Sequence, residues 1–355
     1  MSKHPFVTRQ LVPSALAGAL LLSGALHTAQ AATRSKASVA QISGAGSTFD
    51  APFFTAGFAA YAKSSGVTVT YTANGSAVGV TQFISNKVDF GATDVPMTPI
   101  EAYVATQTGG PFVEIPVILG AVAVVFNPPE VGSHTLQLDG PTLARILLGQ
   151  ISTWNDPAIV NLNPSISLPA TRIVPLHRLD RSGTTNIFTA YLSSISPQWA
   201  NAVGSGKSVG WPVGTAVTGG KGMVSAVANT TGSIGYVDLS AAISNKLSYA
   251  AIKNQANTYQ LPTQASVAQA AAVFPAVTST NYAITNASGH DSYPIATYSW
   301  VLLRQHHANS ARGATLASLF RWMTGTGQNL AGPLNYVPLP ATVQALDAKA
   351  LSNLQ

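Results

Sequence analysis

Hydrophobic residues occur along this chain in two patterns: short continuous runs and stripes with helical spacing. The longest run covers residues 114–127 and another covers residues 294–303, and both have the composition of buried strands. Stripes with a period of three to four residues occur at Phe53, Phe54, Phe58 and Tyr61, at Val80, Phe83 and Ile84, at Ile187, Phe188, Tyr191 and Leu192, and at Leu316, Leu319, Phe320 and Met323. Because strand-like and helix-like segments alternate, the pattern predicts an α/β fold.

The first 31 residues have the pattern of a secretory signal peptide. Lys3 and Arg9 give a positive start, residues 11–26 are apolar, and Ala29-Gln30-Ala31 fits a small-x-small cleavage site. A membrane anchor is the alternative, but the apolar stretch is short for a bilayer span and is interrupted by Pro13. We therefore expect cleavage after residue 31 and export to the periplasm.

Polar, glycine-containing turns occur where a predicted strand is followed by a predicted helix. They lie at Ser47-Thr48-Phe49, at Asn74-Gly75-Ser76 and at Ser182-Gly183-Thr184, and an acidic strand end follows at Asp94. The first turn of a helix has unpaired N–H groups and a partial positive charge, so such turns suit a small oxyanion. The alternative is that the hydroxyl residues only cap helices. Three such turns favour a binding site at the carboxyl ends of the strands.

Composition narrows the classes of function. The 355 residues suffice for two or three globular units, and the absence of cysteine excludes disulfides, thiolate metal sites and cysteine nucleophiles. Only 8% of residues are charged, with a net charge of +6, and the cations are scattered. This distribution does not indicate a nucleic-acid partner, whereas a mild positive field suits an anionic small ligand.

Several motifs suggest nucleotide binding, hydrolysis or metal binding but lack the structural context that each of these functions needs. Residues 204–208 resemble the end of a nucleotide-binding loop and residues 206–210 a hydrolase nucleophile elbow, yet Trp211-Pro212 follows where each requires a helix. We expect residues 204–222 to form a glycine-rich loop region. Adjacent His306 and His307 would point apart on a helix and so would not chelate one metal.

The ordered junctions resemble those of the phosphate-binding subunit of bacterial phosphate ABC transporters. The matching pieces are residues 44–49, 74–76, 88–94, 178–184, 232–237 and 336–340. The resemblance implies a two-lobed periplasmic binding protein of the Venus-flytrap type (type II), whose lobes are discontinuous in sequence. We expect lobe 1 to comprise residues 32–116 and 295–355, and lobe 2 residues 117–294.

The resemblance also implies the residues that hold phosphate. They are Thr48 through its hydroxyl and backbone, Phe49 through its backbone, and Ser76, Asp94, Arg178, Ser182, Gly183 and Thr184. Asp180 matches an acid that steadies the binding arginine, and His177 is a candidate neighbour of that arginine or a packed histidine. Many family members have glycine at the position of Arg181. This chain therefore has two arginines that could contact the ligand, and Arg178 is the one that matches by position.

The function implied is that of a receptor, not an enzyme. It would bind inorganic phosphate, use no cofactor or metal, act as a monomer and deliver its ligand to the membrane permease of an ABC transporter. Three alternatives stay open: a secreted phosphatase on this scaffold, a receptor for another oxyanion such as sulfate, and a surface or adhesion protein. Neither Ser182 nor Thr48 has an obvious base beside it in the sequence, which disfavours the phosphatase.

Overall fold

A computed structural model describes residues 41–128, 131, 135–274, 277–307 and 309–354. The predicted signal peptide lies outside the described residues. Within these ranges, no helix combines the length and the apolarity that crossing a bilayer requires.

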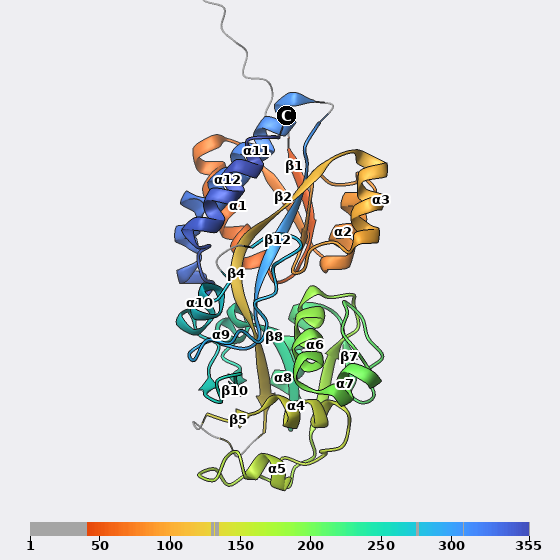
Figure 1. Cartoon of the computed structure of the whole chain (residues 1–355), viewed down its shortest axis with the longest axis vertical. Coiled ribbons are helices and arrows are strands. Elements are labelled where there is room, and N and C mark those ends of the chain that lie inside the picture. The colour runs from red at the N-terminus through yellow and green to blue at the C-terminus, as the bar shows by residue number, and fades with distance from the viewer. Residues whose placement is uncertain (1–40, 129–130, 132–134, 275–276, 308, 355) are drawn as a thin grey trace, which may run out of the picture. The chain divides into compact units, whose positions relative to one another are not determined.

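A mixed sheet runs through the described chain (Figure 1). Its strands follow the order β2 (Val69–Ala73), β1 (Ile42–Gly46), β3 (Phe90–Thr93), β12 (Ala296–Arg304), β4 (Phe112–Asn127), β8 (Ser233–Asp238), β6 (Val174–Arg178) and β7 (Thr215–Val217), and β9 (Ser248–Tyr249) also pairs with β4. The two longest predicted apolar runs are β4 and β12, which pair antiparallel. A small second sheet contains β11 (Tyr259–Gln260), β10 (Ala251–Lys253) and β5 (Gln137–Leu138).

Helices cover the sheet on both faces, as α/β architecture requires. Around β1 and β3, Figure 1 shows α1 (Ala51–Ser65), α11 (Ser310–Thr324) and α12 (Ala341–Leu351) on one side and α2 (Ser76–Ile84) and α3 (Pro99–Gly109) on the other. Around β6 and β8 the helices are α4 (Gly140–Leu147), α5 (Pro157–Val160), α6 (Gly183–Ile195), α7 (Pro197–Ala202), α8 (Gly219–Asn229), α9 (Leu239–Ser244) and α10 (Gln264–Ala272). Two 3₁₀ turns, η1 (Thr326–Leu330) and η2 (Gly332–Leu334), precede α12.

Local sequence explains several of these boundaries. Helix α1 begins beside Pro52, whose fixed φ suits a first turn, and ends at Gly66, which adopts a left-handed φ of 74°. Helix α3 begins with a capping box, in which the Thr98 hydroxyl accepts from the Glu101 N–H and the Glu101 carboxylate accepts from the Thr98 N–H. Strand β12 has a bulge between Ser299 and Trp300, which matters for the site described below.

Two main hydrophobic clusters lie under the helices, and the central strands cross from one to the other. One cluster contains residues from α1, β1, β3 and α11, and the other contains residues from β4, α4, α6, α8 and β8. On β4 the change falls between Ile118 and Leu119, and on β12 it falls between Trp300 and Val301. A smaller cluster lies beneath α2 and α3. The sheet is therefore continuous while its cores are separate.

The expectation of a loop over residues 204–222 is wrong at its end, where β7 and the first turn of α8 lie. Glycines at 219, 220 and 222 give this turn poor intrinsic helix propensity. Packing overrides that preference, because Met223 and Val227 of α8 are fully buried against β8. At Gly235 of β8 an added Cβ would lie 2.9 Å from the Met223 sulfur, so the strand leaves room for the helix.

Candidate functional site

The predicted turns meet where the strands end, and glycines allow their close approach. A Cβ added to Gly183, the first residue of α6, would collide with the Ser76 hydroxyl and lie 2.7 Å from the Asp94 Cβ. A Cβ on Gly75 would lie 3.2 Å from an oxygen of Asp180. Residues far apart in sequence, from the β1–β3 side and from the β6 side, thus form one cluster of polar groups.

Asp94 lies at the centre of this cluster and is only 1% exposed. Hydroxyl groups surround its carboxyl. Ser299 donates to Oδ1 at 3.0 Å, and Ser47 donates to the same oxygen. Ser76 donates to Oδ2 at 3.3 Å and Thr184 at 3.5 Å. Burial raises the pKa of Asp94, and the hydroxyl donors partly offset that rise. Asp94 is therefore a buried acceptor at the centre of the cluster.

Two of these hydroxyl residues, Ser47 and Ser299, are absent from the predicted set. Ser47 follows Gly46, whose φ of 143° and close approach to the backbone of Ala92 exclude a side chain there. Ser299 lies at the β12 bulge, a feature that often re-aims a side chain. Its signal in the sequence is a hydroxyl residue between two aromatic residues, Tyr298 and Trp300.

Thr48 and Phe49 occupy the turn between β1 and α1, as predicted. The Phe49 N–H donates to the Ser47 hydroxyl at 2.9 Å, so this predicted donor is already paired within the turn. The Thr48 hydroxyl has no hydrogen-bond partner within the described part of the chain, and it lies 3.4 Å from the position of a Cβ added to Gly220. Of these two predicted donors, the Thr48 hydroxyl is the one without a partner among the described residues.

Arg178 ends strand β6 and is 5% exposed. Its Nε donates to Asp180 Oδ1 at 2.7 Å and its Nη2 donates to Asp180 Oδ2, which is the predicted steadying contact. Burial acts to raise the pKa of Asp180, but the hydrogen bonds and charge of Arg178 outweigh it and lower that pKa. Asp180 thus stays ionised and fixes the guanidinium plane, while Nη1 makes no hydrogen bond to a described residue.

Arg181, the other arginine in the turn, has a different environment. Its side chain is exposed and makes no hydrogen bond to a described residue, while its backbone carbonyl accepts from the Ala77 N–H at 3.3 Å. A solvated cation at the rim interacts weakly with a ligand compared with a buried one. The burial of Arg178 is therefore the stronger indication of a contact with an anion.

Ser182, Gly183 and Thr184 form the start of α6. The Ser182 hydroxyl accepts from the Thr185 N–H at 3.4 Å, so Ser182 is the helix cap, which was the alternative considered from the sequence. Capping and binding are compatible here, because the hydroxyl proton of Ser182 and the N–H groups of Gly183 and Thr184 have no partner among the described residues.

Helix α8 begins at the same place, which the sequence did not predict. The Gly219 N–H donates to Asp180 at 2.8 Å, and a Cβ on Gly220 would lie 3.9 Å from Arg178 Nη1. The positive ends of α1, α2, α6 and α8 therefore all lie near the Asp94 and Arg178 side chains. Helix ends, a buried arginine and hydroxyl donors together can hold a small tetrahedral anion.

Lys207, which lies in both rejected motifs, and His177 each have partners in the folded protein. Lys207 is 8% exposed; its ammonium lies 3.4 Å from a carboxylate oxygen of Glu101, and its carbonyl accepts from the Ser182 N–H at 2.8 Å. His177 stacks on Trp211 at 4.9 Å, and burial lowers its pKa. Among the described residues, no group of three or more His, Cys, Asp or Glu side chains is placed to hold a metal ion.

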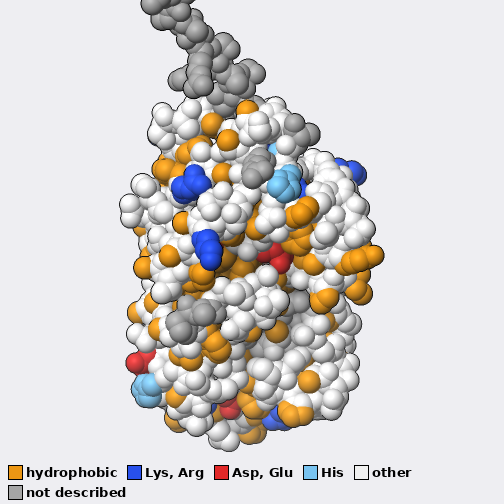
Figure 2. Space-filling model, turned by 45° about the horizontal axis from the view of Figure 1, so that its top comes forward, with side chains coloured by type: hydrophobic (Ala, Val, Ile, Leu, Met, Phe, Trp, Pro, Cys, Tyr) orange, Lys and Arg blue, Asp and Glu red, His pale blue; other side chains and the backbone are white. Residues whose placement is uncertain are grey.

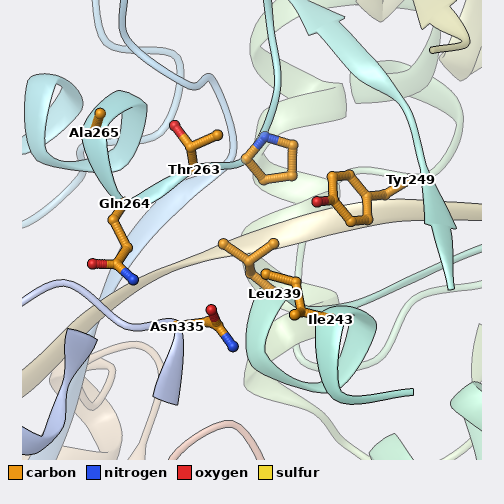
Figure 3. A pocket seen from close by; sticks show the side chains of 8 residues that line it. Leu239, Ile243, Tyr249, Thr263, Gln264, Ala265 and Asn335 are labelled. Carbon is orange, nitrogen blue, oxygen red and sulfur yellow. The ribbon is translucent and has the colours of Figure 1, made fainter. Parts of the chain in front are cut away.

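Surface features elsewhere offer less to an anion. A pocket of about 330 Å³ lies between α9, α10 and Asn335, and its walls include Leu239, Ile243 and Gln264 but no lysine, arginine or histidine (Figure 3). On the face that Figure 2 shows, the basic side chains stand apart and do not form a patch. The cluster around Asp94 and Arg178 is therefore the candidate site.

Sequence comparisons identify relatives over most of the chain. A family model described as "PBP superfamily domain" matches residues 31–325. The chain is 39% identical over 302 residues to the phosphate-binding protein PstS of Xylella fastidiosa (strain 9a5c), covering 84% of this chain and 82% of that protein. It is also 39% identical over 304 residues to PstS of Haemophilus influenzae, covering 85% of this chain and 90% of that protein.

Solved structures share the fold. A high-affinity periplasmic phosphate-binding protein, PfluDING, bound with phosphate, has a TM-score of 0.71 at 22% identity and covers 86% of this chain and 92% of its own. A phosphate-binding protein from Stenotrophomonas maltophilia has a TM-score of 0.68 at 19% identity and covers 87% and 93%. These likenesses confirm the predicted two-lobed α/β fold of type II, and the relatives above confirm the resemblance. The chain belongs to the PstS family of phosphate-binding proteins, within the PBP superfamily.

Proposed function

We propose that this protein is a periplasmic receptor that binds inorganic phosphate between two lobes and delivers it to the membrane permease of a phosphate ABC transporter. The observation that carries the proposal is the placement of Asp94, a buried acceptor, and Arg178, a buried cation, in one cluster, where the charge of Arg178 acts on the pKa of Asp94. Relatives named phosphate-binding protein PstS, at 39% identity, support the choice of ligand.

In this proposal, each side of the site supplies a different kind of contact. Thr48 and Phe49 bind phosphate through the turn before α1, with Ser76 and Asp94 beside them. To do so, the Phe49 N–H would exchange its bond to Ser47 for one to the ligand. Arg178 supplies the cation that Asp180 orients. Ser182, Gly183 and Thr184 supply hydroxyl and backbone donors at the start of α6.

Asp94 accounts for a preference for phosphate over sulfate. Phosphate near neutral pH keeps at least one proton and can donate it to the carboxylate, whereas fully ionised sulfate would meet it acceptor to acceptor. Burying unpaired polar groups against each other costs roughly 3 kcal/mol or more, or about a hundredfold in affinity. Selection of this kind comes from repulsion of the wrong ligand.

The lobes we infer are residues 32–116 with 295–355, and residues 117–294. The two hydrophobic clusters and the two crossing strands support this division. Because ligand groups come from both lobes, phosphate should favour a closed arrangement over an open one. Small-angle scattering should give a smaller radius of gyration with saturating phosphate, and an unchanged radius would argue against closure. We also infer a monomer, exported by cleavage after residue 31.

Binding without catalysis follows from the same geometry. Within the described residues, neither the Ser182 nor the Thr48 hydroxyl bonds to a histidine or another base, so no activated nucleophile faces the ligand. The PstS relatives belong to a family of transport receptors and not of enzymes.

Equilibrium dialysis with labelled phosphate tests the proposal. We expect saturable binding of one phosphate that excess sulfate or a phosphate monoester does not displace, and no release of phosphate from a chromogenic monoester above a heat-treated control. Absence of binding would reject the receptor. Monoester hydrolysis that is lost with Ser182→Ala or Thr48→Ala would support the phosphatase alternative.

A further inference from the structure

A second buried acid, Asp50, lies directly after the Thr48-Phe49 turn and has no role in the site as described so far. It is 0% exposed and is the residue before α1, but its side chain makes no capping bond. Neither of its carboxyl oxygens has a hydrogen-bond partner among the described residues. An ionised carboxylate in such surroundings would be strongly destabilising, because burial without a partner leaves its charge uncompensated.

The hydroxyl groups that surround Asp50 use their protons elsewhere. Tyr71 donates to the carbonyl of Ser47 at 2.7 Å, and Tyr336 donates to the carbonyl of Phe49 at 2.6 Å. Ser299 donates to Asp94 at 3.0 Å. A carboxylate at Asp50 would therefore depend on the Ser299 proton that Asp94 already accepts, whereas a neutral acid brings its own proton.

The charged neighbours of Asp50 also oppose its ionisation. Burial raises the pKa of Asp50 well above its usual range, the charges of Asp94 and Asp238 raise it further, and Ser299 offsets only a part. Asp238 is itself a buried acid whose pKa burial raises to about 7. The titratable and charged groups around Asp50 are Asp94, Asp238, Tyr71, Tyr336 and, through its effect on Asp94, Arg178.

We propose that Asp50 is a positioning residue for the phosphate site, a neutral protonated acid that leaves the single negative charge of the pair on Asp94. This inference rests on the proposed function. Two buried acids at one site behave as a coupled pair, and the protonation of one sets the charge of the other. With the proton on Asp50, Asp94 is an acceptor and selects an anion that carries a proton. With that one proton on Asp94 instead, Asp94 would no longer be a pure acceptor and the selection would be lost.

A pH series on wild type and Asp50→Asn tests this role. The amide keeps the shape of the acid and cannot ionise, and the titration of phosphate itself cancels when the two proteins are compared at each pH. We expect the ratio of the wild-type to the Asp50→Asn Kd for phosphate to rise at least about tenfold from neutral to alkaline pH, because Asp50 loses its proton in the wild type only and a second negative charge then opposes the anion. A ratio that does not change with pH would overturn the proposal.

Asp347→Asn is the matched control. Asp347 is a second acid that is 2% exposed, and its pKa is raised to about 8 by burial alone, without a contribution from the acids of the site. Its replacement should leave the pH profile of phosphate binding as in the wild type. If Asp347→Asn changed the profile as Asp50→Asn does, general loss of a buried acid would explain the effect and the proposal would fail.

Infrared spectroscopy reports the proton directly and does not depend on phosphate binding. At neutral pH the difference between wild type and Asp50→Asn should contain the carbonyl band of a protonated carboxylic acid, and a carboxylate band in its place would overturn the proposal. If the wild type bound no phosphate at any pH, the proposed function would fail, while this spectrum would still decide the state of Asp50. If Asp50→Asn does not fold, Asp50→Ser repeats the comparison, because serine is common at the position before a helix.

Discussion

The two sides of the site have opposite chemistry. On the β1, β3 and β12 side, Asp94 and Asp50 are buried among hydroxyl groups, and no lysine or arginine of the described chain bonds to them. On the β6 side, Arg178 lies at the starts of α6 and α8 with one carboxylate, Asp180, to orient it. The second side would attract any small anion, and the first would repel one that has no proton to donate. We therefore assign affinity to the β6 side and selectivity to the β1, β3 and β12 side.

Removing the cation should have the largest effect. Deletion of one partner of a buried charged pair costs roughly 2–5 kcal/mol, so Arg178→Ala should weaken phosphate binding by about thirtyfold or more. It also leaves Asp180 without its main partner. Arg181→Ala is the matched control, because it removes the same charge from an exposed position and should change the Kd only slightly. Titration calorimetry gives both values, and the opposite ranking would mean that Arg181 is the ligand contact.

Changing the acid should alter selectivity more than affinity. Asp94→Asn replaces a repulsive oxygen with an amide donor, so the roughly hundredfold preference for phosphate over sulfate should shrink. Competition titrations with the two anions on wild type and variant measure this. Equal rejection of sulfate by both proteins would show that Asp94 is not the discriminator.

A substitution that pushes the two sides of the site apart should have an intermediate effect on phosphate affinity. A methyl group on Gly183 meets Asp94 and Ser76, and overpacking of this kind costs roughly 1–3 kcal/mol, so Gly183→Ala should weaken binding about fivefold to a hundredfold. Gly210→Ala is the control, because no atom lies within 4 Å of its added Cβ. Phosphate affinity of Gly183→Ala equal to that of the control would contradict the close approach.

The ion pair beside the site should contribute least. Lys207 lies 3.4 Å from Glu101 of α3, but Glu101 is partly exposed, and such pairs are worth roughly 0.2–1 kcal/mol. Lys207→Met should therefore raise the Kd for phosphate by no more than about fivefold, and more at low salt than at high salt. Lys63→Met removes an equal charge from an exposed position on α1 and serves as control. A loss as large as that of Arg178→Ala would give Lys207 a direct role in binding.

The two sides also differ in how far the sequence predicts them. The β6 side is local: Arg178, Asp180 and Ser182 lie within one turn, so their neighbourhood can be read from consecutive residues. The same is true of α1 and the long strand β4, whose hydrophobic spacing is unbroken. The exception is the first turn of α8, where glycines at 219, 220 and 222 mask a helical turn that tertiary packing creates.

The acid side depends on contacts between distant residues and was predicted only in part. Asp94 was found from its place at a strand end, but its donor Ser299 is 205 positions away and reaches it through a strand bulge. Asp50 has the sequence context of an ordinary helix cap, and only the structure shows that its carboxyl is buried and caps no described N–H group. Burial and missing partners are properties of the folded chain that no local pattern contains.

A crystal structure of the protein grown with phosphate tests the division between the two sides most directly. We expect one phosphate whose oxygens lie within hydrogen-bond distance of the Asp94 carboxyl on one side and of the Arg178 guanidinium on the other. A phosphate bound elsewhere, or in contact with only one of these two side chains, would contradict the assignment of selectivity and affinity to opposite sides of one site.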